Sequence, residues 1–351
     1  MDRYIGIDVH SKSCTVAVMN ATGQRLKEQV IETSATVLID AMRSIAGKRH
    51  VCFEEGVLSS WIYELLEPNV DELVVVQPHT RQQGSKSDSI DAWALAENLR
   101  TGSIKRRVFK NPRRFDQLRQ AVRAYQIAVQ DMTRAKNRLN ALYRSRAIQV
   151  DAAIYDPKQR TEWLRKLPTA HRMLGEMLSQ QLDALIEAHR RAEQWLHKEA
   201  LQLAEVKRLM TVDGLGPIRA AQIVAVVLVP ERFRTKRQFW SYCGLAIVTR
   251  SSSDYVRNPS TGQWWRQPVI QTRGLNRNRS PILKNAFKAA ARTVIAMPTH
   301  PLHADYERML EDGTKPNLAT LTIARRIAAA VLAIWKHKED YTREKHRQTA
   351  A

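Results

Sequence analysis

The stretch YIGIDVHSKSCTVAVMNATGQRL, residues 4–26, decides the fold of the first part of the chain. Apolar and β-branched residues dominate residues 4–8 and 14–19, and the residues NATGQ that follow are typical of a turn. This pattern predicts two strands, and RLKEQVIET, residues 25–33, predicts a third strand after the turn. The chain therefore begins with a three-stranded meander.

Strands and helices alternate after this meander. We expect a helix near residues 34–46, a strand over 50–55, a helix over 59–67, a strand over 72–78 and a helix that opens in KSDSIDAWALAEN, residues 86–98. A meander followed by alternating strands and helices is typical of an α/β layer structure. Sites in such sheets collect at the carboxyl ends of strands.

Acidic residues stand where this sheet would place a site. Asp8 ends the first strand, and Glu54 and Glu55 end the fourth. Asp88 and Asp91 lie one turn apart where the last helix opens. Taken singly, each acid is more often a helix cap or a surface charge. Together they suit Mg²⁺ or Mn²⁺, and two such ions about 4 Å apart can clamp the attacking and leaving oxygens of a phosphodiester.

Three details of this acidic set follow from local geometry. Alternation along a strand sends Glu54 and Glu55 to opposite faces, and we favour Glu54 as the ligand. Asp91 shares a helix face with apolar residues, so one acid is expected to point toward the core, where it needs a partner. His10 is expected to be a turn residue near the edge where the metal would bind.

The charge of the chain is divided unevenly. The 351 residues carry a formal net charge of +21, yet residues 1–100 alone carry −4 and the remainder +25. A strongly basic region indicates a polyanionic partner, most often nucleic acid. The three cysteines show no metal-type or paired spacing, no apolar run approaches a membrane span, and the N-terminus lacks a signal-peptide core. We therefore expect a soluble protein of a reducing cytosol.

The middle of the chain is predicted to be helical. After KNPRRF a heptad-like seam is formed by Phe115, Leu118, Val122, Tyr125, Val129, Met132, Leu139 and Tyr143, with Lys136 as its polar interruption. A helix packed inside its own domain and a coiled coil between chains both fit a seam this short. A second helical stretch, roughly residues 170–209, would pair with the first as a hairpin across YDPKQ. Basic residues flank the first helix: Arg134, Lys136, Arg138, Arg144 and Arg146.

The C-terminal part combines basic loops with apolar helices. A Gly-x-Gly-Pro turn at residues 214–217 precedes an apolar helix, either as a plain helix–helix turn or as a phosphate contact. Another apolar helix ends at Gly244, and the serines at 251–253 follow soon after it. Serines in basic loops are mostly caps or phosphate contacts, but a serine near arginines attacks phosphorus if a base or metal activates it. Residues 318–335 are predicted to form a core helix.

Aromatic and basic residues are interleaved in this part, which suits stacking on bases or sugars. A tryptophan pair packed in the core is an equally good explanation. The predicted nucleic-acid contacts are Arg250, Arg257, Trp264, Trp265, Arg273, Arg277, Arg279 and Lys284.

The motifs GID, VCFEEG and KSDSIDAWALA resemble the N-terminal RuvC-like domain of insertion-sequence-110 family transposases, a family that includes Piv-type invertases and bridge-RNA-guided recombinases. The resemblance extends to VDGLGPIRAAQI, FWSYCGL, the serines and RGLNRN. It implies an α/β RuvC/RNase H-like domain over 1–112, a helical coiled-coil region over 113–205 and a mainly α serine transposase domain over 206–351. The family's Asp, Glu, Asp, Asp quartet falls on Asp8, Glu54 (or Glu55), Asp88 and Asp91.

The resemblance also implies a mechanism. Counting from Gly244 places the nucleophile on Ser252, with Ser251 and Ser253 as alternatives, and the quartet would hold Mg²⁺. The implied partners are DNA, a noncoding guide RNA and further copies of the chain in a homodimer or homotetramer, in the bacterial cytosol. Three features depart from the family pattern: Asp213 replaces a proline, residues 254–272 form a longer segment, and a third serine replaces a glycine.

Three functions are compatible with these observations. The first is a site-specific recombinase that forms a covalent phosphoserine link to DNA. The second is a RuvC-like metal-dependent nuclease in which water attacks and the serines only contact phosphate. The third is a nucleic-acid-binding scaffold whose acids are structural. The charge division and the joint placement of the acids favour the enzymes, and the serine loop favours the recombinase.

Overall fold

The computed structural model describes residues 1–78, 88–104, 107–108, 113–249, 255–266, 272–276 and 278–343. The chain divides into two compact units, Met1–Asn111 and Pro112–Ala351, and each is described by itself.

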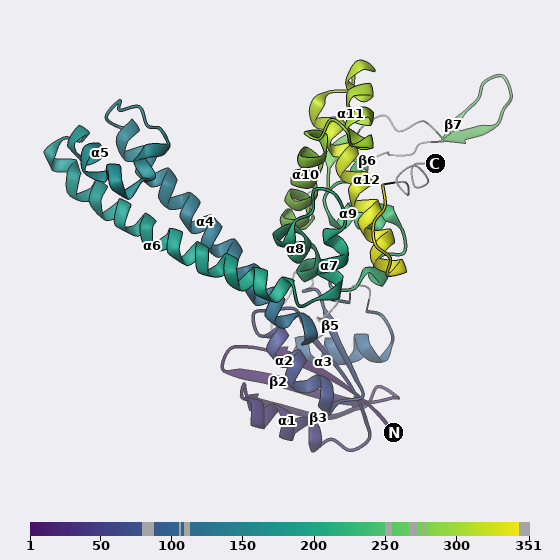
Figure 1. The fold of residues 1–351 in the computed structure, drawn as a ribbon. Helices are drawn as coiled ribbons and strands as arrows, with labels where there is room; N and C mark the ends of the chain where they lie inside the picture. Colours follow the sequence, from purple (N-terminus) through teal and green to yellow (C-terminus); the bar gives the residue numbers. More distant parts are fainter. Residues whose placement is uncertain are drawn as a thin grey trace. The chain divides into compact units, whose positions relative to one another are not determined.

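The first unit is built on a five-stranded sheet (Figure 1). Its strands are β1 (Asp2–Val9), β2 (Ser13–Asn20), β3 (Arg25–Glu32), β4 (Lys48–Glu54) and β5 (Glu72–Val76). The order across the sheet is β3-β2-β1-β4-β5, with antiparallel pairing in the meander and parallel pairing of β1 with β4 and of β4 with β5. The predicted meander and α/β layering are confirmed.

Helices cover both faces of this sheet: α1 (Ala35–Arg43), α2 (Ser59–Leu66) and α3 (Asp88–Arg100). Residues of β1 alternate between the faces. Ile5 and Ile7 pack in a buried cluster with residues of α1 and α2. Gly6 instead lies against α3, and a side chain at its position would meet the carbonyl oxygen of Ala92 at 1.9 Å. A glycine in β1 therefore lets α3 dock closely on the sheet.

Gly6→Ala should destabilise this unit strongly. The added Cβ would clash with helix backbone, which cannot rotate away as a side chain can, so α3 must shift. Overpacking of this kind costs about 3 kcal/mol, measurable as a lower free energy of unfolding in urea. Gly56→Ala is the matched control, because among the described residues nothing lies within 4 Å of the point that its Cβ would occupy. Equal stability of the two variants would contradict close docking at Gly6.

The second unit begins with a long helical hairpin. Helix α4 (Asp116–Arg144) runs alongside α6 (Thr169–Ala200), and the connection holds the short 3-10 turns η3 (Ala152–Tyr155) and η4 (Pro157–Gln159) and helix α5 (Arg160–Lys166) (Figure 1). The two helices are antiparallel, because the ring of Tyr125, in the first half of α4, contacts the ring of His189, in the second half of α6. The ring centroids are 5.2 Å apart and the ring planes are inclined by 45°. The hairpin prediction is confirmed, and YDPKQ, residues 155–159, lies in the middle of the connection between the two helices.

The apolar seam of α4 faces α6 of the same chain. Leu118, Val122, Leu139 and Tyr143 are buried as expected, and the seam also contains small residues that the heptad pattern passed over: Ala121, Ala128 and Ala135. Alanines at these positions let the two helices approach closely. The seam therefore has a partner within its own chain, and a coiled coil between chains is not confirmed.

The helical stretch predicted over residues 170–209 is divided into two helices. Helix α6 ends at Ala200, and α7 (Ala204–Met210) begins after Leu203, whose φ of −97° and ψ of 124° are extended. The break redirects Val206 and Leu209 into the C-terminal core. The same core contains Phe115, Leu118 and Leu196, so the ends of the hairpin share a core with the C-terminal helices.

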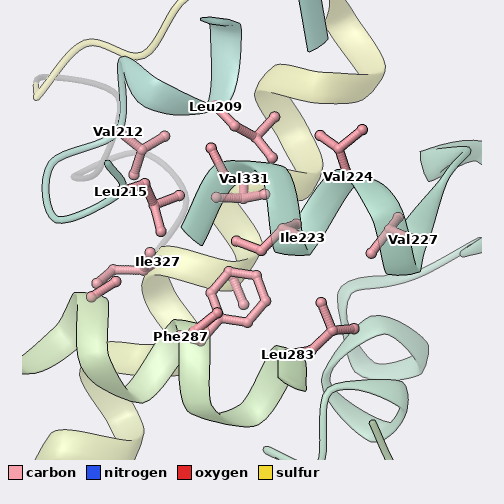
Figure 2. Packing of buried hydrophobic residues seen from close by; sticks show 14 of the residues in the cluster. Leu209, Val212, Leu215, Ile223, Val224, Val227, Leu283, Phe287, Ile327 and Val331 are labelled. Atoms are coloured by element: carbon pink, nitrogen blue, oxygen red, sulfur yellow. The ribbon is translucent and has the colours of Figure 1, made fainter. Parts of the chain in front are cut away.

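The C-terminal core is made of small and branched residues from several helices. These helices are α7, α8 (Pro217–Val227), α9 (Lys236–Tyr242), α10 (Pro281–Ile295), α11 (Pro301–Glu311) and α12 (Pro316–His337). Two 3-10 turns also lie in the second unit, η2 (Arg113–Phe115) and η5 (Pro230–Arg232), and a third, η1 (Glu67–Asn69), lies in the first unit. Figure 2 shows Leu283 and Phe287 of α10 lying among side chains of α8 and α12.

Helix α12 is long and apolar enough to cross a membrane by length and composition, contrary to the expectation that no such segment exists. Its side chains explain the composition. Ile327 and Val331 are buried in the C-terminal core, and 61% of the apolar window lies inside the protein. The predicted role of this segment as a core helix is confirmed.

The described residues of the second unit also include two small two-stranded sheets. Strand β6 (Ile247–Thr249) pairs antiparallel with β9 (Thr272–Leu275), and β7 (Tyr255–Arg257) pairs antiparallel with β8 (Trp264–Arg266).

Candidate metal centre and nucleic-acid contacts

Asp8 and Asp88 come together at one end of the sheet. Asp8 lies near the carboxyl end of β1, two residues beyond Gly6 and hence on the face that α3 covers. Asp88 is the first residue of α3. His10 follows β1, and its Nε2 lies 3.1 Å from Oδ2 of Asp8 and 3.3 Å from Oδ2 of Asp88. Ligand atoms of all three side chains lie within 4.8 Å of one another.

The register of the parallel strands places Glu54 on the same face. Ile7 of β1 pairs with Phe53 of β4, so the next pair along the strands is Asp8 with Glu54. In β4, Cys52 packs against Leu95 and Leu99 of α3, whereas its neighbours belong to the opposite cluster.

The residue after Glu54 has another environment. The backbone N–H of Glu55 donates to the carbonyl of Val76 at 2.8 Å, which continues the ladder to β5. Alternation then turns the Glu55 side chain to the face of α1 and α2. The choice of Glu54 over Glu55 is thereby favoured by strand geometry.

Asp91 adds a further negative charge. It lies one turn after Asp88 and is half-buried, while Ala92, next in the chain, is fully buried against the sheet. Burial raises the pKa of Asp8, and the charges of Asp88 and Asp91 raise it further against the opposing effect of His10. Carboxylates that repel one another in a half-buried position are stabilised by a cation. The donor set of carboxylate oxygens fits Mg²⁺ or Mn²⁺.

His10 has more contacts than a turn residue needs. Its backbone N–H donates to the carbonyl of Ser13 at 3.0 Å and its carbonyl accepts from Oγ1 of Thr33 at 2.8 Å, which is the expected turn. Its imidazole also bridges the two aspartates described above. In the sequence, only the position of His10 two residues after Asp8 indicated that it could lie near the acidic residues. Its contact with Asp88 depends on how α3 docks on the sheet.

Ser251, Ser252 and Ser253, together with Arg250 and Arg277, lie outside the described residues. The backbone of Arg273 belongs to β9, and its side chain is outside the described part of the chain.

The hairpin of β7 and β8 exposes its aromatic residues. Trp264 is 65% exposed, Trp265 51% and Tyr255 61%. Val256 pairs with Trp265 and Arg257 with Trp264 across the strands. Packing of the tryptophan pair in the core, one of the two explanations considered from the sequence, is therefore wrong. Exposed indoles next to a cross-strand arginine form a surface on which bases can stack.

Arg279 and Lys284 form a basic cluster together with Lys288. The Arg279 side chain packs over Gly244, where an added Cβ would meet its Cδ at 1.9 Å, and it donates to the carbonyl of Asn276 at 3.1 Å. Burial lowers the pKa of Lys284, and the charges of Arg279 and Lys288 lower it further. A bound anion would offset the mutual repulsion of these positive charges.

Asp213 has a structural role. The buried His300 donates from Nε2 to its carboxylate at 3.1 Å, since Nδ1 of His300 accepts the Leu302 N–H. The Arg343 guanidinium lies 3.0 Å away and holds the pKa of Asp213 below its usual range. Gly214, with φ of +82°, approaches the backbone of α10, so the adjacent turn is explained by helix packing.

Comparison with known proteins identifies the two regions just described. Residues 5–145 match a family model described as "Transposase", that of the DEDD domain of IS110-type elements, and residues 206–265 match the model "Transposase IS116/IS110/IS902 family". A protein of Pseudomonas aeruginosa named "Probable family 20 transposase" is 34% identical over 104 residues. That alignment spans 29% of this chain and 28% of the relative. The acidic sheet edge and the region that contains the serines therefore lie in two parts of the chain that are similar to transposase domains of the IS110 family.

Proposed function

We propose that the protein is an IS110-type transposase that breaks and rejoins DNA through a covalent link to Ser252. The observation that carries this proposal is the docking of α3, which brings Asp88 to Asp8 and His10 at the sheet edge. Acids convergent at such an edge are expected of a nuclease-like centre and not of a scaffold. The matched family region 206–265 contains the candidate serine.

The carboxylate group is proposed to hold Mg²⁺ or Mn²⁺ through Asp8, Glu54, Asp88 and Asp91. A divalent ion bound there would supply charge stabilisation for the phosphorane and the leaving oxygen. The chain's own contribution is to fix the ligands on rigid elements. Asp8 and Glu54 sit on paired strands, and Asp88 and Asp91 on the first turn of α3. The close approach at Gly6 sets their separation.

In the proposed reaction the Ser252 hydroxyl attacks phosphorus of a DNA phosphodiester. A bond forms between Oγ and phosphorus, one bridging P–O bond breaks, the serine proton passes to a base, and a general acid or water protonates the leaving oxygen, so that the DNA leaves with a free hydroxyl. Rejoining reverses these events, with a DNA hydroxyl as the attacking group. The energy of the broken phosphodiester is retained in the serine ester, so strands can be exchanged without a further cofactor.

A denaturing gel tests this proposal against its alternatives. Purified protein is incubated with Mg²⁺, RNA transcribed from the flanks of the gene, and end-labelled DNA spanning an element junction. A labelled band linked to protein supports the recombinase. Cleaved DNA without attached protein would move the assignment to a metal-dependent nuclease, and uncut but bound DNA would favour the scaffold. Omitting the RNA tests whether the proposed noncoding guide is required.

Trp264 and Trp265 are proposed to stack on unpaired bases of DNA or guide RNA. Replacing both with alanine should weaken binding of single-stranded oligonucleotides by at least about 10-fold, since stacking contributes roughly 1–3 kcal/mol per base. Stability should not change, because both side chains are exposed. Fluorescence anisotropy measures the affinity. Trp195→Ala, a partly exposed tryptophan of α6, is the control, and an equal loss in that variant would argue against a specific platform.

Self-association is proposed to involve exposed apolar residues of α6. Met173 is 69% exposed and Met177, one turn later, 59%. Apolar surface of this kind is typical of contacts between proteins. We expect the double variant Met173→Asp, Met177→Asp to shift the protein toward monomer in analytical ultracentrifugation, whereas Gln181→Asp on the same helix should not. A wild-type monomer would contradict the proposed homodimer or homotetramer.

A further inference from the structure

We propose that His10 is itself a ligand of the metal centre, so that the site combines an imidazole nitrogen with carboxylate oxygens and discriminates Mn²⁺ from Mg²⁺. This inference rests on the metal site of the proposed function and adds a residue that lies outside the quartet of acids. It does not require His10 to take part in proton transfer.

The distances between the donor atoms suit a shared ion. Nε2 of His10 lies 3.1 Å from Oδ2 of Asp8 and 3.3 Å from Oδ2 of Asp88. In an octahedral site with bonds of about 2.1 Å, adjacent ligand atoms are separated by about 3.0 Å. Nε2 of His10 therefore stands at nearly the spacing of neighbouring ligands from each of the two aspartate oxygens, and ligand atoms of all three side chains lie within 4.8 Å of one another.

The backbone around His10 holds the imidazole in place. Its N–H and carbonyl are both bonded, to Ser13 and Thr33, so the turn after β1 is fixed at the sheet edge. The side chain is 44% exposed, which leaves the ring accessible to an ion arriving from solvent. A positioned but accessible donor is what an exchangeable metal site requires.

The donor type predicts a preference among metals. Mg²⁺ strongly prefers oxygen ligands, whereas imidazole suits later divalent transition metals, and affinity rises from Mn²⁺ along the series. Removing the imidazole should therefore weaken Mn²⁺ binding more than Mg²⁺ binding. We expect His10→Gln to raise the Mn²⁺ dissociation constant about 10-fold or more and the Mg²⁺ constant less than about 3-fold. Glutamine keeps a hydrogen-bonding group near the aspartates but has no imidazole nitrogen.

Electron spin-echo envelope modulation of Mn²⁺ bound to the full chain gives the direct test. Wild-type protein should show ¹⁴N modulation from a coordinated imidazole, and labelling with ¹⁵N-histidine should replace it. The signal should vanish in His10→Gln and persist in His50→Gln, the control, because His50 of β4 is occupied with Asp2 and Glu72.

The outcomes separate this inference from the proposed metal site. Mn²⁺ that binds, requires Asp8 and shows no histidine nitrogen would overturn the role of His10 while leaving the carboxylate site standing. Equal losses of Mn²⁺ and Mg²⁺ affinity in His10→Gln would also overturn it, because a residue that only positions the aspartates affects both ions alike. Absence of Mn²⁺ binding in wild-type protein would overturn the metal site and this inference together.

Discussion

Asp8→Asn is expected to reduce DNA cleavage at least about 1000-fold while leaving the fold intact. Asparagine has nearly the shape of aspartate but no negative charge, so the centre loses a ligand that it needs for binding a divalent ion. Metal stabilisation of a developing charge contributes several kcal/mol, and roughly 4 kcal/mol corresponds to this loss of rate. Cleavage of end-labelled junction DNA measures the effect.

The same variant should be no less stable than wild type. The pKa of Asp8 is raised by burial and by neighbouring acids, so the folded protein binds this proton more tightly than the unfolded chain does. The ionised form is thus disfavoured in the fold near neutral pH, and stability falls as pH rises through the raised pKa. A neutral asparagine avoids that cost.

Thermal unfolding with and without Mg²⁺ provides a second measurement. Mg²⁺ should raise the melting temperature of wild-type protein, because a ligand that binds only the folded state stabilises it, and Asp8→Asn should lose this response. Asp40→Asn, an exposed acid of α1 on the opposite face of the sheet, is the control. Full cleavage by Asp8→Asn would exclude Asp8 from the centre.

Ser252→Ala is expected to remove the protein–DNA adduct altogether, with binding of DNA and RNA unchanged. Alanine lacks only the hydroxyl, so a nucleophile is lost while every basic residue of the chain is kept. Loss of an attacking serine typically lowers turnover by about 10³-fold or more. Gel electrophoresis under denaturing conditions measures the adduct, and filter binding measures the affinity.

The neighbouring serines are the controls for this prediction. Ser251→Ala and Ser253→Ala should retain the adduct, and a variant of either that loses it while Ser252→Ala keeps it would reassign the nucleophile. Mixing Ser252→Ala with Asp8→Asn adds a further test. If the serine and the carboxylates of different protomers act on one phosphodiester, mixed oligomers should recover part of the activity that each variant lacks alone.

The elements of the first unit follow from local patterns. Alternating apolar residues in the segment 4–26 and the turn residues NATGQ specify strands because each strand's side chains repeat every two residues. The helices of the hairpin are likewise predicted by apolar residues that recur every three or four positions. The extended Leu203 interrupts that spacing without a proline or glycine, so the break between α6 and α7 had no local signal.

The exposure of the tryptophans could not be predicted either. The local sequence around a tryptophan in a strand does not show whether the strand packs on a core or forms an exposed hairpin. In the β7–β8 hairpin both Trp264 and Trp265 are exposed, and neither belongs to the C-terminal core of described residues. Burial depends on what covers a face, which is a property of the folded chain.

By itself, the sequence determined the order of strands and helices in the first unit, the charge division and the acidic residues at the ends of elements, because these depend on neighbours in the chain. Tertiary structure alone decided that Glu54 and not Glu55 shares the face of Asp8, since this follows from the pairing of β1 with β4. It also decided that His10 meets both Asp8 and Asp88. That contact requires α3 to dock on Gly6, far away in sequence, and no local periodicity encodes it.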